Sequence, residues 1–123
     1  MQFNLDNNIG KYQINAYQPG QVIINKQTYT NSIIITPEQI ITNWAPQSFA
    51  EITADNLKII LDMVPQVVII GTGEQQHFLG QELLLPFLQQ GIGIEIMNTD
   101  AACRTYNVLM SEGRNVVAAL VLK

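Results

Sequence analysis

The sequence predicts an α/β fold that contains a pair of parallel strands. The main observation is a strand–helix–strand succession in the second half of the chain, which has 123 residues. Two apolar runs, 67–70 and 92–97, flank a segment over 79–90 whose apolar residues recur at helical spacing. A crossover of this kind joins parallel strands and is almost always right-handed. The loops after Ile70 and Met97 should therefore share one edge of the sheet, where open α/β sheets usually bind ligands.

Composition limits the function classes that the chain can belong to. The length predicts a single domain over residues 1–123 with a core of its own. The net charge is −4 and the six basic residues form no cluster, so nucleic-acid binding lacks its basic footprint. Only 13% of the residues are charged, about half the usual share of roughly 25%. A weakly charged surface favours a partner-binding or self-associating protein, and a soluble monomer with an amide-rich surface fits equally well.

Signals for targeting, metal binding or a cofactor are missing from the sequence. The N-terminal residues lack the basic and apolar regions of a signal peptide, and no apolar run approaches the roughly 18 residues of a membrane helix. The single cysteine, Cys103, excludes an internal disulfide and a multi-cysteine zinc site. His77 is the only histidine, which gives a metal site poor support. We expect a cytoplasmic protein with no transmembrane segment, no metal and no cofactor.

The first half of the chain is expected to form covering β structure. Polar and apolar residues alternate over 12–16, which predicts a half-buried strand. The runs 22–24 and 28–30 flank Asn25-Lys26-Gln27 and predict a hairpin. A β-branched run over 32–36 predicts a short buried strand.

The first helix is predicted after an irregular stretch that extends from Pro37 to Phe49. Trp44 lies in that stretch, and its ring either covers the edge of the core or stacks on a ligand. Thr53 can cap the helix, because its hydroxyl can accept a free backbone N–H. Apolar residues then recur at helical spacing as far as Pro65, which cannot follow a helical residue easily.

Two more helices complete the second half of the chain. The one before Gly91 should begin no earlier than about Leu83 or should kink at Pro86, because a proline inside a helix clashes with the preceding turn. The last helix can be capped by Thr99 or Asp100. A final apolar strand follows it at the C-terminus.

The candidate binding residues lie in the two loops that should share the sheet edge. They are Gly71, Thr72, Gly73, Asp100, Cys103, Arg104 and Thr105. The Gly71-Thr72-Gly73 run resembles the start of a dinucleotide fingerprint, but the next glycine is Gly80. A tight turn that needs glycine torsions therefore explains the two glycines better than a nucleotide site does.

The position of Cys103 supports two interpretations of its role. In the first turn of a helix beside Arg104, its thiol could have a lowered pKa, and His77 could approach it to form a nucleophilic pair. The other reading is simple packing, because a free cysteine is among the most buried residue types. We expect Cys103 to be mostly buried and slow to react.

Arg104 calls for a partner, because a cation in the first helical turn opposes the helix dipole. Asp100, four residues earlier, is the first candidate. The alternatives are a backbone carbonyl of the 71–73 loop or an anion bound at the helix N-terminus.

The chain resembles a known family in three stretches: Gly71-Thr72-Gly73, the Cys-Arg-Thr-Tyr-Asn run of 103–107, and Glu112-Gly113-Arg114. The family consists of small domains of unknown function and includes mitochondrial complex I assembly factor 3 and an adipogenesis-associated domain protein. The similarity covers about residues 9–122. It implies a three-layer α/β domain with a central mixed sheet, helices on one face and additional β structure on the other. It implies no established catalytic activity.

The function that we expect is a non-enzymatic binding or assembly module that acts through protein contacts. The low charge, the missing catalytic constellation and the resemblance to an assembly factor favour it. The alternative is a small-molecule- or anion-binding protein, or an enzyme, that uses the Gly71–Gly73 loop and the N-terminus of the 100–112 helix.

Overall fold

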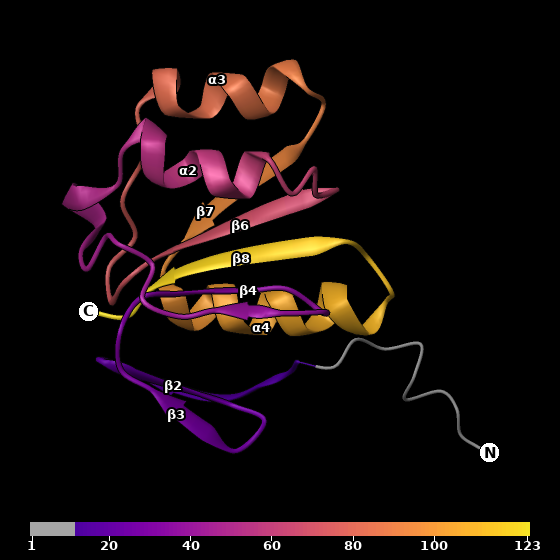
Figure 1. Ribbon diagram of the computed structural model, residues 1–123. Helices are drawn as coiled ribbons and strands as arrows, with labels where there is room; N and C mark the ends of the chain where they lie inside the picture. The colour runs from indigo at the N-terminus through magenta and orange to yellow at the C-terminus, as the bar shows by residue number, and fades with distance from the viewer. Residues whose placement is uncertain (1–11) are drawn as a thin grey trace.

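A five-stranded mixed sheet forms the centre of the structure, a computed structural model that describes residues 12–123 (Figure 1). The strand order is β5-β4-β8-β6-β7. Strand β6 (Val67–Thr72) pairs in parallel with both β7 (Gly93–Met97) and β8 (Val116–Val121). Strand β4 (Ile33–Ile35) is antiparallel to β8, and β5 (Ile40–Ile41) is antiparallel to β4. The predicted parallel pairing of the two central strands is confirmed.

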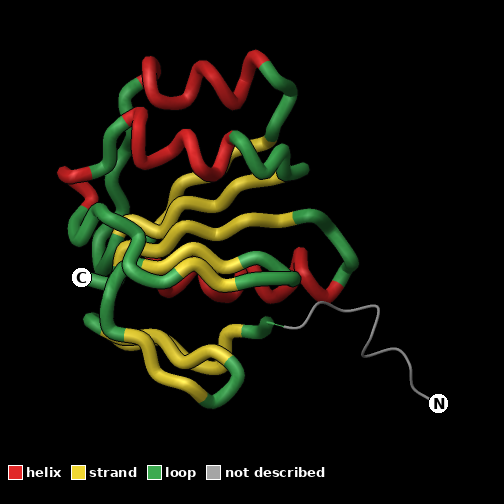
Figure 2. The backbone as a smooth tube through the Cα atoms, viewed as in Figure 1, coloured by secondary structure: helices red, strands yellow, loops and turns green. Residues whose placement is uncertain are grey.

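Three helices cover this sheet, and Figure 2 shows them on both of its faces. Helices α2 (Ala54–Leu61) and α3 (Gln81–Gln89) cover one face. Helix α4 (Thr99–Ser111) covers the other face. The chain moves outward from β6 to β7 and back across β6 to β8. Right-handed crossovers that run in opposite directions along a sheet place their helices on opposite faces, which is the arrangement of α3 and α4.

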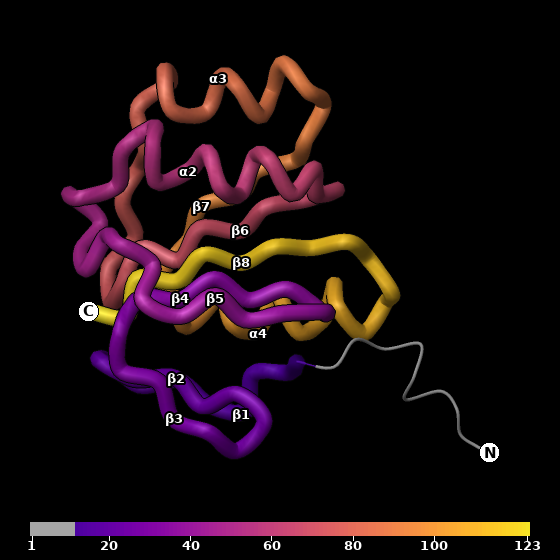
Figure 3. The backbone as a smooth tube through the Cα atoms, viewed as in Figure 1, coloured from indigo at the N-terminus to yellow at the C-terminus, as the bar shows by residue number. Residues whose placement is uncertain are grey.

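A second sheet packs outside α4, and Figure 3 shows its three strands at the bottom of the view. It is an antiparallel meander of β1 (Ile14–Gln18), β2 (Gln21–Ile24) and β3 (Gln27–Tyr29). The predicted α/β class, with a mixed sheet, covering helices and additional β structure, is confirmed. The placement of α4 refines the expected layering, because this helix lies on the same face as the additional β structure.

The core lies on both sides of the central sheet. All six residues of β6 and all six of β8 are buried, as expected for strands covered on both faces. Successive side chains point to opposite faces, so Ile69 and Leu120 pack towards α4 and the small sheet. Ile70 and Val121 pack towards α2 and α3.

The hairpin between β2 and β3 forms as predicted, with a turn at Asn25 and Lys26. Both residues have positive φ, 49° and 73°, which matches the twist of a two-residue hairpin turn. The alternation predicted over 12–16 is wrong in one respect. The strand register shifts between Ile14 and Ala16, so Ile14 is buried and Ala16 is exposed.

The stretch from Pro37 to Phe49 is more ordered than predicted. Strand β5 lies within it, and the 3-10 helix η1 (Phe49–Glu51) begins at its end. The Thr36 hydroxyl oxygen accepts the Gln39 backbone N–H at 2.9 Å, which stabilises the turn that brings β5 onto β4. Trp44 covers the core edge, where it is buried and its indole N–H donates to a backbone carbonyl.

Two of the predicted helix starts need correction. Helix α3 begins at Gln81, which is earlier than Leu83, and Pro86 lies inside it. The proline is in the second turn of a nine-residue helix, where it removes a single N–H from the ladder. A kink at Pro86 stays a prediction.

The N-cap of α4 is Asn98 rather than Thr99 or Asp100. Its Oδ1 accepts the Ala101 backbone N–H at 2.8 Å. The cap predicted for α2 is confirmed, because the Thr53 side chain accepts the Asn56 N–H and the Asn56 side chain accepts that of Thr53.

Candidate functional site

The Gly71–Gly73 loop and the start of α4 lie together, and Thr99 joins them. The Thr99 backbone N–H donates to the Gly73 carbonyl at 2.9 Å, and the Gly73 N–H donates to the Thr99 hydroxyl oxygen at 2.8 Å. The Thr99 hydroxyl in turn donates to the Val121 carbonyl at 2.5 Å. Thr99 is fully buried, so one side chain connects the ends of β6 and β8 to the start of α4. This junction is the structural centre of the predicted edge.

The two glycines of the loop are required by close packing. A Cβ at Gly71 would lie 2.8 Å from Thr99 Oγ1 and 3.0 Å from a methyl carbon of Leu120. Gly73 has φ +95°, and a Cβ there would collide with the Lys123 carbonyl oxygen. Gly73 also gives its N–H to Thr99. The loop is therefore a packed turn and not a cradle for phosphate groups.

Thr72 also uses its side chain within the loop. It is 2% exposed, and its hydroxyl lies 2.6 Å from the Gln75 carbonyl oxygen and 3.2 Å from that of Met97. These contacts fix the loop after β6 to the end of β7. The hydroxyl is therefore engaged with the backbone and is not presented to a ligand.

Cys103 is buried, as predicted, with 5% of its surface exposed. Burial raises the pKa of its thiol to about 12, and the nearby Asp100 carboxylate adds to this rise. Arg104 acts in the opposite direction but more weakly. The hypothesis of a reactive Cys103 required a lowered thiol pKa, and this expectation is therefore wrong.

His77 does not pair with Cys103. Its ring stacks on that of Phe49, with the ring centroids 4.6 Å apart. Phe49 packs on the side of the sheet that α2 and α3 cover, whereas Cys103 belongs to the core on the α4 side. A cysteine–histidine nucleophile does not form in this structure.

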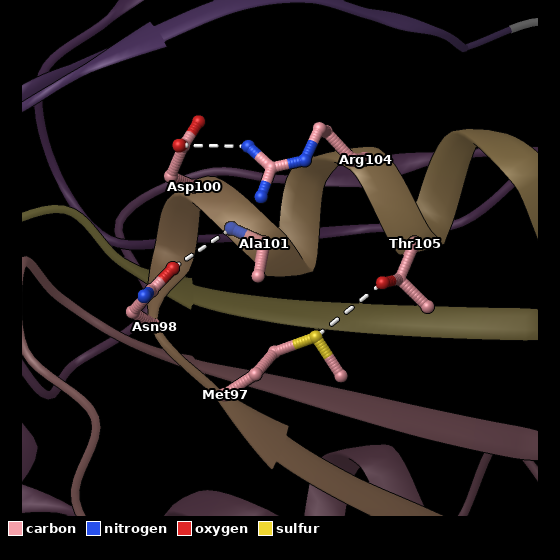
Figure 4. A network of polar contacts seen from close by, with 6 residues as sticks. All are labelled: Met97, Asn98, Asp100, Ala101, Arg104 and Thr105. Carbon is pink, nitrogen blue, oxygen red and sulfur yellow. Dashed lines mark hydrogen bonds and ion pairs between the residues drawn. The ribbon is translucent and has the colours of Figure 1, made fainter.

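Arg104 forms an ion pair with Asp100, the first partner predicted for it (Figure 4). Arg104 Nη1 lies 2.7 Å from Asp100 Oδ2, and the two side chains are 68% and 63% exposed. An exposed pair four residues apart on a helix stabilises it by about 0.3–0.5 kcal/mol. Figure 4 also shows that the Thr105 hydroxyl points at the Met97 sulfur, 3.4 Å away. Arg104 therefore supports its own helix and does not bridge the two loops.

Two open clefts flank the junction at this edge. The first, of about 350 Å³, is lined by Tyr17, Gln18, Pro19, Gly73, Glu74, Asn98 and Asp100. Burial raises the pKa of Tyr17, with smaller contributions from the charges of Cys103, Glu74 and Asp100. The second, of about 370 Å³, is lined by Thr72, Glu74, Gln75, His77 and Lys123. The first cleft has two carboxylates on its wall, and one of them, Asp100, is paired with Arg104.

Two residues of the Cys-Arg-Thr-Tyr-Asn run have roles that the sequence reasoning missed. The side-chain amide of Asn107 donates to the Ile14 carbonyl at 2.7 Å, and Asn107 Oδ1 accepts the Ile14 N–H at 2.9 Å. The buried Tyr106 hydroxyl donates to the Tyr12 carbonyl at 2.8 Å. Together they attach α4 to β1. A polar residue beside a buried aromatic one on a helix was the only local signal for this role.

The exposed apolar side chains gather elsewhere, mainly around α3. Among residues 12–123, six large apolar side chains are exposed: Ile59, Val64, Phe78, Leu85, Leu88 and Val108. Three of these six lie between residues 78 and 88, in the segment that leads into and forms α3. A groove of about 230 Å³ between α2 and α3 has apolar walls that include Leu57, Leu61, Leu83, Pro86 and Phe87. This helical layer offers the apolar surface that the βα edge lacks.

None of the helices among residues 12–123 combines the length and the apolar character that crossing a membrane requires.

Comparisons with known proteins identify a family and a solved structure that match this chain. A family model described as "Protein of unknown function (DUF498/DUF598)" matches residues 14–121. A crystal structure of a protein from Bordetella parapertussis has a TM-score of 0.87 and 40% sequence identity, and the match covers 93% of this chain and 98% of that one. Nearly the whole described structure therefore has a solved counterpart.

Two curated proteins that carry names are similar to this chain. The chain is 30% identical over 106 residues to the "13 kDa major membrane protein" of Francisella tularensis subsp. holarctica (strain LVS), which covers 85% of this chain and 86% of that protein. It is 30% identical over 110 residues to NADH dehydrogenase (ubiquinone) 1 alpha subcomplex assembly factor 3 of Homo sapiens. That match covers 88% of this chain and 59% of the human protein, so the chain spans little more than half of the human protein's length.

Proposed function

This chain belongs to the DUF498/DUF598 family of proteins of unknown function, and from that premise we propose that it is a non-enzymatic module that binds a protein partner during assembly of a larger complex. Its relatives include proteins named NADH dehydrogenase (ubiquinone) 1 alpha subcomplex assembly factor 3. The name of such a relative describes assembly and no reaction. A module of this kind binds its partner through its surface, so the proposal depends on whether one surface is suited to protein contact.

The observation that carries the proposal is the exposed apolar surface of α3. Leu85 is 46% exposed and Leu88 is 55% exposed, and residues three apart lie on the same side of a helix. Large exposed apolar groups that gather in one segment are typical of protein-contact surfaces. Each removes apolar area from water when a partner covers it, at roughly 25 cal/mol per Å².

The alternative, an anion or small-molecule site at the βα edge, has weaker support. Glu74 and Asp100 line the cleft there, and Arg104 is already paired with Asp100. The hydroxyls of Thr72 and Thr99 are engaged with the backbone. Of the basic side chains near this edge, Arg104 is held by Asp100, and Lys123 lies on the wall of the second cleft beside Glu74.

Purification of the tagged chain from its host at native expression tests the proposal. We expect a complex of fixed stoichiometry with a different protein, measured by light scattering and mass spectrometry. The double variant Leu85→Ser/Leu88→Ser should retain its fold but lose at least about tenfold in partner recovery, the scale of losing apolar anchors at an interface. Val64→Ser is the matched control, because Val64 is 67% exposed but lies outside α3. Recovery of the chain alone, or only as a homo-oligomer, would refute the proposal.

We place this function in the cytoplasm, on the strength of the sequence alone. One relative is named a membrane protein, which points to a different compartment. Fractionation of host cells into soluble and membrane extracts, followed by quantification of the chain in each, decides between them. A chain that remains with the membranes after a high-salt wash would overturn the cytoplasmic assignment.

A further inference from the structure

The outer edge of β7 is an open sheet edge. Strand β7 is the last strand of the central sheet, and among residues 12–123 no strand pairs with its outer side. The opposite end of the sheet is β5, which has two residues. In the small sheet, the side chain of Asn107 pairs with β1 at Ile14. The five residues of β7 therefore form an edge with no neighbouring strand in the described part of the chain.

The backbone groups on this edge can be assigned from the ladder. The Gly93 N–H donates to the Gln66 carbonyl, and alternate residues of a parallel strand bond to the same neighbour. Glu95 therefore points its backbone groups at β6, while Ile94 and Ile96 point theirs outward. The Gln76 side-chain amide donates to the Ile96 carbonyl at 3.4 Å, in the position that the N–H of a further strand would occupy.

The two flanks of the edge differ in chemistry. Ile94 and Ile96 pair in register with Val68 and Ile70, so their side chains lie on the face that α3 covers. Leu88 is exposed on α3, on the side of the helix away from the residues that line the groove against α2. Glu95 is exposed and pairs in register with Ile69, so it lies on the α4 face.

We propose that β7 takes up an extended segment of the partner protein as a sixth strand of the sheet. Apolar side chains of that segment contact Ile94, Ile96 and Leu88, and a Lys or Arg on its other face pairs with Glu95. Strand addition gains affinity from main-chain hydrogen bonds and specificity from alternate side chains. This inference deepens the proposed function and rests on it, because it names the kind of segment that the partner offers.

The occupant is a different protein rather than a second copy of this chain. Two copies that pair antiparallel over the full length of β7 would place Glu95 directly opposite its counterpart. Like charges in directly opposed positions destabilise a strand pair. The same carboxylate stabilises a partner strand that carries a basic residue at that position.

A displayed library of nine-residue peptides tests the inference. Odd positions are restricted to Val, Ile and Leu, and even positions are fully random. Selection against the wild-type chain should enrich Lys or Arg at an even position, and selection against Glu95→Lys should enrich Asp or Glu there instead. Glu38→Lys is the matched control, since Glu38 is exposed and lies in the turn between β4 and β5, away from β7. It should select the same peptides as the wild type.

The selected peptide, made synthetically, then tests the strand geometry. N-methylation of the alternate residues whose N–H groups face β7 should weaken its binding at least about tenfold, while methylation of the other set should leave it unchanged. No enrichment, enrichment that Glu95→Lys does not alter, or equal effects of both methylated sets would overturn the inference. The proposed function survives those results if the native complex still depends on Leu85 and Leu88, and it fails independently if no complex is recovered.

Discussion

The side chain of Asn107 forms two hydrogen bonds with the backbone of Ile14, 93 positions earlier in the chain, at 2.7 and 2.9 Å. This amide pairs with β1 as a neighbouring strand would, and it connects the small sheet to α4. Asn107→Ala leaves the Ile14 N–H and carbonyl without these partners, which costs roughly 1–3 kcal/mol of unfolding free energy. Asn31→Ala, which removes an exposed bond to Asn43, should cost much less. Denaturant titrations compare the two, and equal losses would contradict the structural role of Asn107.

The space at Gly71 gives a second prediction. Gly71→Ala places a methyl group 2.8 Å from Thr99 Oγ1 and 3.2 Å from the Cβ of Ala102, and overpacking of this kind costs roughly 1–3 kcal/mol. Gly93→Ala is the control, because the nearest atom to its added Cβ is 3.7 Å away. It should change stability by less than about 0.5 kcal/mol. Thermal melts that rank the two variants in the opposite order would show that the junction around Thr99 can relax.

The buried thiol of Cys103 gives a third prediction, which concerns its reactivity. A pKa of about 12 leaves very little thiolate at neutral pH, and thiolate is the form that reacts. Iodoacetamide should label the native chain far more slowly than the same chain in urea. Labelling of the native chain faster than that of free cysteine would revive the nucleophile hypothesis.

The raised pKa of the Cys103 thiol also makes the free energy of unfolding depend on pH. In the unfolded chain the thiol ionises near its ordinary pKa of 9.0, while in the folded chain it stays protonated until about pH 12. Ionisation therefore favours the unfolded state in that window, so the contribution of this thiol to stability is constant below about pH 9 and falls as pH rises towards 12. Cys103→Ala should reduce the slope of unfolding free energy against pH over this range. An unchanged slope would mean that the thiol is not responsible.

The exposed Arg104–Asp100 pair gives a fifth prediction. Arg104→Ala should lower stability by no more than about 0.5 kcal/mol in dilute buffer, and by less at high salt. Added phosphate should affect wild type and variant equally, because Arg104 is already paired with Asp100 and is not held ready for an anion. Melts with and without phosphate check both points. A phosphate response present in the wild type and lost in the variant would restore the anion site.

The parallel pair could be predicted from sequence because its evidence is local. The run 67–70 is uniformly apolar and ends at Gly71, and a helical segment of adequate length follows it. The face that α4 covers could not be predicted, since it depends on the order β8-β6-β7, which no local pattern specifies. Strand β5 was missed for a similar reason, because two residues form a strand only where β4 is there to pair with them.

The sequence predicted that the Gly71–Gly73 loop and the start of α4 share one edge of the sheet, but not the side-chain contacts that join them. Several short polar residues stand at the start of α4, and any of them can cap a helix. The choice of Asn98 follows from tertiary structure, since the Thr99 hydroxyl bonds to Val121 instead. The role of Asn107 was invisible because its partner, Ile14, is distant in sequence. The burial of Cys103 could be predicted, because residue type alone favours it.

Hydrogen–deuterium exchange on the purified native complex tests the central claim most directly. That claim is that a partner protein binds on the side of α3 and β7, and not at the βα edge. We predict that the partner slows exchange in peptides that cover β7 and α3 relative to the free chain, and leaves those covering 71–75 and 98–101 unchanged. Protection confined to 71–75 and 98–101, with β7 and α3 exchanging as in the free chain, would contradict it.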